Sequence, residues 1–157
     1  MKNLFIFIKT IAVLSFLVVN ANVSKAQQIP SAQLQNNPWT KTQLMEPSVL
    51  ANMIEKGQKI RIYNIGVVED IKGATHLGAS SEKLNVEKLS KVLKGLPKNE
   101  AIVVYCGCCP MDKCPNIRPA FQLLKDQKFT KAYLLNLTVN LKTEWISKGY
   151  PLATPVK

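Results

Sequence analysis

The sequence concentrates its cysteines in one short segment, VVYCGCCPMDKCPNIRPAF, and no other part of the 157-residue chain contains one. Cys106, Cys108, Cys109 and Cys114 lie within nine positions. Thiolates can act as nucleophiles, pair as disulfides or bind soft metal ions. Because all four are so close in sequence, they cannot link distant parts of a fold, and their chemistry belongs to one loop.

The elements that must hold this loop alternate between helices and strands. Apolar residues recur at helical spacing, with Pro, Gly or Asn at the boundaries, over 47–57, 83–97, 116–127 and 140–149. Short apolar runs without that spacing predict strands over 59–65, 101–106 and 131–137. Between these segments we expect a glycine-rich loop over 66–82, and before them an extended lead-in over 27–46.

Two local details of the predicted helices are expected as well. The helix over 83–97 should bury one apolar set, formed by Leu84, Leu89, Val92, Leu93 and Leu96. Asn116 should cap the N-terminus of the helix that follows the cysteines.

This alternation predicts a single α/β domain with a central parallel sheet and helices on both faces. In such sheets ligands bind at the carboxyl ends of the strands. The cysteine loop follows the carboxyl end of the most apolar strand, so its position predicts a functional site.

Charge and composition narrow the possible partners. The net charge is +11, but the lysines are scattered, with no run of five or more like charges. We therefore expect no nucleic-acid partner and a mild attraction for small anions.

The N-terminal residues 1–26 are typical of an export signal. Lys2 precedes an apolar stretch that ends at Val19, and Ser24-Lys25-Ala26 offers a small-residue cleavage site, with Val19-Asn20-Ala21 as a second one. Since Lys9 interrupts the stretch, the remainder is too short to span a bilayer. We expect an exported protein, periplasmic or secreted, without stable membrane insertion after signal removal.

Several segments resemble, in the right order, the signatures of rhodanese-like (sulfurtransferase) domains. RIYNIGVVEDIKGATHLGA resembles the first signature, IVVYC the central strand that ends in the catalytic cysteine, and EWISKGYPL the closing signature. RPAFQLLKDQKFTKAYLL is similar to the helix and strand after the active-site loop. The resemblance covers residues 47–153 and implies a rhodanese-like fold with no cofactor and no metal.

The chain also departs from the family pattern. Asn64 stands in place of the usual aspartate, Gly66 in place of an arginine, and Asp70 in place of a histidine. The glycine pair before the last helix is absent, and the active-site loop is longer and richer in cysteine than usual. These differences leave the substrate open.

The resemblance implies that Cys106 accepts a sulfane sulfur from a small sulfur-containing anion and passes it to a thiol or small nucleophile. Such a cysteine must be ionised and reachable by anions. We expect loop N–H groups, the N-terminus of the next helix, and Lys113 or Arg118 to lower its pKa. The resemblance assigns to the active-site loop, besides Cys106, the residues Gly107, Cys108, Cys109, Met111, Asp112, Lys113, Cys114, Asn116 and Arg118.

Other interpretations of the cysteines stay open. Cys108, Cys109 or Cys114 could resolve a persulfide on Cys106, or a disulfide to Cys114 could be a structural clip. The four thiols could instead serve a thiol–disulfide redox protein, since Cys106 to Cys109 form a C-x-x-C pair, or bind zinc or copper. A cysteine phosphatase is disfavoured because Asp112 stands where that chemistry needs an arginine.

Overall fold

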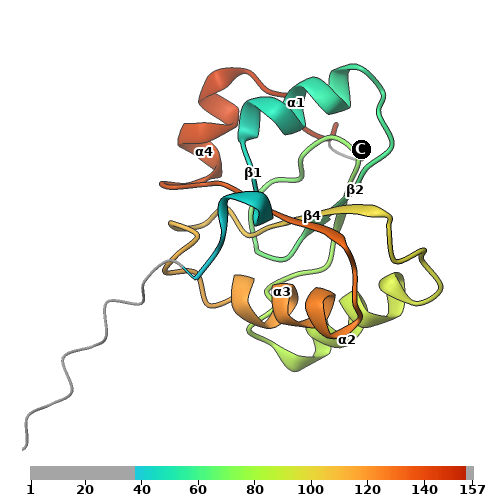
Figure 1. Ribbon diagram of the computed structural model, residues 1–157. Helices are drawn as coiled ribbons and strands as arrows, with labels where there is room; N and C mark the ends of the chain where they lie inside the picture. The colour runs from blue at the N-terminus through green and yellow to red at the C-terminus, as the bar shows by residue number, and fades with distance from the viewer. Residues whose placement is uncertain (1–37, 155–157) are drawn as a thin grey trace, which may run out of the picture. The chain divides into compact units, whose positions relative to one another are not determined.

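A five-stranded parallel sheet forms the centre of the structure, a computed structural model that describes residues 38–154 (Figure 1). The strand order is β1-β5-β4-β2-β3, and every neighbouring pair is parallel. The strands are β1 (Leu44–Met45), β2 (Arg61–Asn64), β3 (Ala74–His76), β4 (Ala101–Tyr105) and β5 (Lys131–Leu135). The predicted export signal lies outside the described residues. No helix within residues 38–154 has the length and apolar character needed to cross a membrane.

Helices cover both faces of the sheet, as Figure 1 shows. One face carries α1 (Pro47–Glu55) and the short α4 (Leu141–Glu144). The other carries α2 (Lys83–Leu93) and α3 (Ile117–Asp126). Two apolar cores follow, one on each side of the sheet, so the predicted α/β class with helices on both faces is confirmed.

The middle strand, β4, is buried on both of its faces. Its residues from Ile102 to Tyr105 are fully buried, with alternate side chains in the two cores. A continuous apolar run is what a strand needs when helices cover both faces of a parallel sheet. The segment AIVVYC therefore fixes Cys106 at the carboxyl end of the most enclosed strand.

Two short edge strands were not expected from the sequence. β3 lies inside the segment that we predicted to be a loop, and β1 lies in the predicted lead-in, where a 3-10 helix (Lys41–Gln43) precedes it. With three and two residues, these strands are too short to show an apolar alternation. Pairing with β2 and β5 holds them in the sheet.

The apolar set predicted for α2 is partly wrong. Leu89 and Leu93 are fully buried, whereas Leu84 is 70% exposed and Val92 is at the surface. Asn85 takes an inward position instead, where its Nδ2 donates to the carbonyl of Ala79. The first turn of α2 thus binds the preceding loop with an amide rather than entering the core with Leu84.

The predicted helix over 140–149 divides at Trp145 into α4 and a 3-10 turn (Ile146–Lys148) that ends at Gly149. Trp145 is fully buried, and its Nε1 donates to the carbonyl of Pro151 at 3.0 Å. Its ring packs edge-on against Tyr150, with 5.2 Å between the ring centres. The segment after Trp145 is thereby held against the turn that leads into β3. There Ile71 and Leu152 form an antiparallel β-bridge.

We expect Trp145→Ala to lower the free energy of unfolding by about 3–5 kcal/mol, because it leaves a large cavity and removes the hydrogen bond to the carbonyl of Pro151. Urea denaturation measures the loss. Val67→Ala is the control, since Val67 is 74% exposed and should change stability by less than about 0.5 kcal/mol. Equal stabilities for the two variants would contradict the anchoring role of Trp145.

Candidate active site

The loop from Cys106 to Asn116 leaves β4 at its carboxyl end and is held there from two sides. The carbonyl of Gly107 accepts from the amide of Leu141 at 2.9 Å, and the amide of Met111 donates to the carbonyl of Leu137 at 3.0 Å. These bonds fasten the loop to the segment that follows β5. The segment after β5 therefore supports the loop. This is the segment that lacks the glycine pair typical of rhodanese-like domains.

The start of the loop needs a glycine at position 107. Gly107 has a φ of 77°, in the left-handed region that other residues rarely adopt. A Cβ there would lie 2.8 Å from Cβ of Leu141 and 3.0 Å from Cγ2 of Val68. Gly107 is therefore required both by the turn and by the close approach of its neighbours.

A second glycine, Gly66, touches Cys106 from the end of β2. A Cβ at this position would lie 2.5 Å from the Cys106 carbonyl oxygen and 2.9 Å from its Sγ. Such distances exclude any side chain, so the arginine typical of this position in rhodanese-like domains would not fit here. The departure at residue 66 thus follows from the packing around the sulfur.

The other departures from the family pattern lie in the same network. Oδ1 of Asn64 accepts from the amide of Gly66 at 3.0 Å. Nδ2 of Asn64 donates to Oδ1 of Asp70 at 2.8 Å, and His76 contacts both side chains through Nδ1. Asn64 thereby holds Gly66 against Cys106. The sequence showed these residues only as isolated differences, and nothing in it indicated that they are connected.

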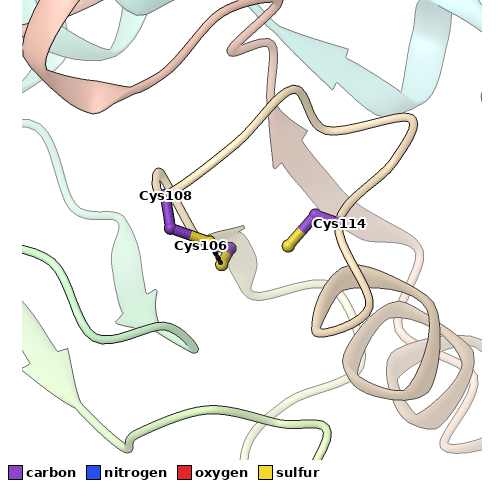
Figure 2. Close-up of side chains that lie close together, drawn as sticks. All are labelled: Cys106, Cys108 and Cys114. Carbon is purple, nitrogen blue, oxygen red and sulfur yellow. Dashed lines mark hydrogen bonds between the residues drawn. The ribbon is translucent and has the colours of Figure 1, made fainter.

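Three of the four thiols converge, as Figure 2 shows. The Sγ atoms of Cys106, Cys108 and Cys114 all lie within 4.8 Å of one another, and Cys106 and Cys108 are 3.2 Å apart. Sγ of Cys109 lies 3.4 Å from that of Cys108 but outside the three-sulfur cluster. All four cysteines are free thiols in this structure.

The cluster places one negative charge on Cys106. A hydrogen bond from the Cys114 thiol is the largest of the effects that lower the pKa of Cys106, from 9.0 to about 5, against the opposing effect of burial. Nδ2 of Asn116, at 3.1 Å from Sγ, and the backbone N–H of Cys108 lower this pKa further. Since the amide of Asn116 is directed at Cys106, the thiolate resides there.

The neighbouring thiols remain protonated. The pKa of Cys114 is raised well above its ordinary range, chiefly by its hydrogen bond to Cys106. Burial, followed by the hydrogen bonds to Cys106 and Cys109, raises the pKa of Cys108 to about 12. The cluster therefore contains a single thiolate with thiol donors beside it.

Three expectations for the loop are corrected. Asn116 does not cap α3, because its Nδ2 donates to Cys106 and its Oδ1 accepts from the amide of Ser81 at 2.8 Å. The described groups that lower the pKa of Cys106 are all neutral, so neither Lys113 nor Arg118 contributes. Cys106 is also 1% exposed, so its sulfur is not directly open to anions.

The remaining loop residues lie around the cluster. Met111 is buried in the core, Asp112 is half-buried and Lys113 is exposed. Arg118 lies over the ring of Trp39 instead of the sulfurs, with 5.9 Å between its Cζ and the ring centre. Arg118 and Trp39 line a surface pocket of about 420 Å³, whose lining contains no cysteine.

The three-sulfur cluster could hold a soft ion such as Cu(I), because thiolates select such metals. Structural zinc sites normally have four ligands in tetrahedral geometry. Within residues 38–154 no histidine or carboxylate joins the three sulfurs to complete such a set. The donor set therefore fits zinc poorly.

Comparison with known proteins shows the fold. No protein-family model and no curated protein matches the chain. The solved structure of Alr3790 from Anabaena sp. is similar at a TM-score of 0.50 and 22% identity, over 72% of this chain and 94% of that one. The single-domain sulfurtransferase RDL2 of Saccharomyces cerevisiae is similar at a TM-score of 0.47 and 14% identity, over 71% and 95%. The chain has a rhodanese-like α/β fold.

We expect Asn116→Asp to raise the pKa of Cys106, because a carboxylate keeps the acceptor for Ser81 but replaces the amide donor with a negative charge. A hydrogen bond to a charged group is worth about 1.5–3 kcal/mol, which corresponds to a rise of 1–2 pH units. Thiolate ultraviolet absorbance across a pH series measures it. In the wild type, the Cys106 absorbance should be lost as pH falls through about 5.

The control is Gln58→Glu, which adds the same charge at an exposed position after α1. It should leave the midpoint of the Cys106 titration where the wild type has it. A midpoint that is unchanged in Asn116→Asp would show that the amide does not stabilise the thiolate.

Proposed function

We propose that this protein is a sulfurtransferase that carries a sulfane sulfur as a persulfide on Cys106. The observation that carries the proposal is the thiolate at the carboxyl end of β4, where a parallel α/β sheet normally binds its ligand. A rhodanese-like fold with a stabilised thiolate at this position has the nucleophile that sulfur transfer needs.

The first chemical step is an attack by Sγ of Cys106 on the outer sulfur of a small anion such as thiosulfate. A sulfur–sulfur bond forms on Cys106, and the bond to the sulfonate sulfur breaks, so that sulfite leaves with the bonding pair. The persulfide keeps the negative charge that the thiolate had. The amide of Asn116 and the N–H of Cys108 then stabilise an anionic sulfur in both states.

Access to the buried sulfur depends on Cys108. Its side chain is exposed and lies in contact with Sγ of Cys106. Exposed side chains change rotamer within picoseconds to nanoseconds. Rotation of Cys108 gives a small anion a path to Cys106, and the positive net charge of the protein favours the approach of anions.

As part of this proposal, the protein acts outside the cytoplasm. The export signal expected over residues 1–26 supports this part of the proposal. In an oxidising compartment free thiols form disulfides unless a partner keeps them reduced. A thiol-dependent sulfur carrier there requires a reduced thiol as its acceptor.

Incubation of the reduced protein with thiosulfate should add the mass of one sulfur atom, measured by intact-mass spectrometry. Cys106→Ser should take up none, because it lacks the nucleophile. Cys109→Ser is the matched control and should take up the sulfur, since Cys109 lies outside the three-sulfur cluster.

Uptake of sulfur by Cys106→Ser would contradict the assignment of the nucleophile. The same samples test the metal interpretation of the three-sulfur cluster. One equivalent of copper or zinc retained by the reduced wild type through gel filtration, together with no uptake of sulfur, would show that the cluster is a metal site instead.

A further inference from the structure

The sulfur atoms form a path from the interior to the surface. Cys106 is 1% exposed, Cys108 lies 3.2 Å from it by Sγ and is exposed, and the two are drawn side by side in Figure 2. Cys114, the third member of the cluster, is buried. Cys108 is therefore the member of the cluster through which the buried sulfur meets the solvent.

A persulfide on Cys106 places its outer sulfur beside Cys108. The sulfur must enter a space bounded by Cys108, Cys114 and Gly66, all of which lie close to Sγ of Cys106. A small nucleophile can follow the path that the donor used. A thiol on a peptide or a protein cannot, because its backbone would have to enter the loop with it.

We infer that Cys108 is a second catalytic cysteine, which takes the sulfane sulfur from Cys106 and presents it at the surface to a thiol on a peptide or protein acceptor. This relay rests on the proposed function, because it requires the persulfide on Cys106. It deepens that function by assigning the class of acceptor.

The transfer balances without an oxidant or a reductant. Sγ of Cys108 forms a bond to the outer sulfur, and the bond between that sulfur and Sγ of Cys106 breaks. The bonding pair stays on Cys106 as a thiolate, while the proton of the Cys108 thiol passes to the transferred sulfur. An acceptor thiolate then removes this sulfur, and Cys108 takes up a proton from water.

The structure favours attack on the outer sulfur over attack on the inner one. Attack on the outer sulfur regenerates the Cys106 thiolate, for which Asn116, Cys114 and the N–H of Cys108 supply hydrogen bonds. Attack on the inner sulfur would expel hydrosulfide and form a Cys106–Cys108 disulfide. Thiols of low pKa leave faster, and thiols of high pKa are the stronger nucleophiles once ionised, so the pKa values of this pair favour the same direction.

The test separates loading from discharge. Wild type, Cys108→Ser and Cys109→Ser are loaded with thiosulfate, freed of donor, and mixed with cyanide or with a cysteine-containing peptide. Intact mass then follows the loss of sulfur. Relative to the wild type, Cys108→Ser should slow discharge to the peptide at least about tenfold more than it slows discharge to cyanide. Cys109→Ser keeps the Cys106–Cys108 pair and should retain most of the discharge to the peptide.

Each other outcome overturns the relay. Equal peptide rates for Cys108→Ser and the wild type would do so, as would an equal slowing with cyanide and peptide, which indicates a structural role. Discharge of the wild type with release of sulfide and formation of a disulfide would show attack on the inner sulfur. A wild type that takes up no sulfur overturns the proposed function and the relay with it.

A second measurement applies if the Cys108→Ser variant takes up no sulfur from thiosulfate. The loaded wild type is alkylated and digested, and fragmentation of the peptide that contains Cys106 and Cys108 locates the extra sulfur. The relay predicts populations on both cysteines. Sulfur on Cys106 alone would overturn the relay while leaving the proposed function intact.

Discussion

The hydrogen bond from Nδ2 of Asn116 to Sγ of Cys106 joins the two ends of the cysteine loop, and the site depends on it. The same side chain accepts from the amide of Ser81, so one amide group binds the sulfur, the loop and the segment before α2 together. A buried thiolate is unfavourable unless donors replace its hydration. Asn116 supplies such a donor at a fixed position, and the strand β4 fixes the sulfur that receives it.

The site stabilises its charge with neutral groups although the protein is strongly basic. Arg118, one of the two basic residues that we expected to contribute, packs on Trp39 instead. Hydrogen bonds from buried neutral donors are little affected by salt, whereas ion pairs at the surface are screened. The ionisation of Cys106 therefore depends on the geometry of the loop rather than on ionic strength, and Gly66 and Gly107 are part of that geometry because they admit the close contacts around it.

Much of the fold could be predicted from the sequence, because the helical segments show a clear apolar spacing and the central strand is a continuous apolar run. AIVVYC and the helix that carries Phe121 could be buried in few other ways. β1 and β3 could not be predicted, since strands of two and three residues depend on their neighbours for pairing. Leu84 was misplaced because helical spacing alone does not say where the edge of a buried face lies.

The reactive cysteine could be located, since it ends a buried strand, but its surroundings could not. Asn116 was expected to cap a helix, and whether its side chain turns to a backbone amide or to a sulfur is decided by tertiary contacts. The same holds for Asn64, Gly66 and Asp70, which are separate in sequence and form one network in space.

A crystal structure of the reduced protein after exposure to thiosulfate tests the central claim most directly. The account predicts one additional sulfur atom bonded to Sγ of Cys106, within reach of the Asn116 amide and in contact with Cys108. Additional sulfur on Cys114 alone, or an unmodified Cys106 that has lost its contact with Asn116, would contradict it.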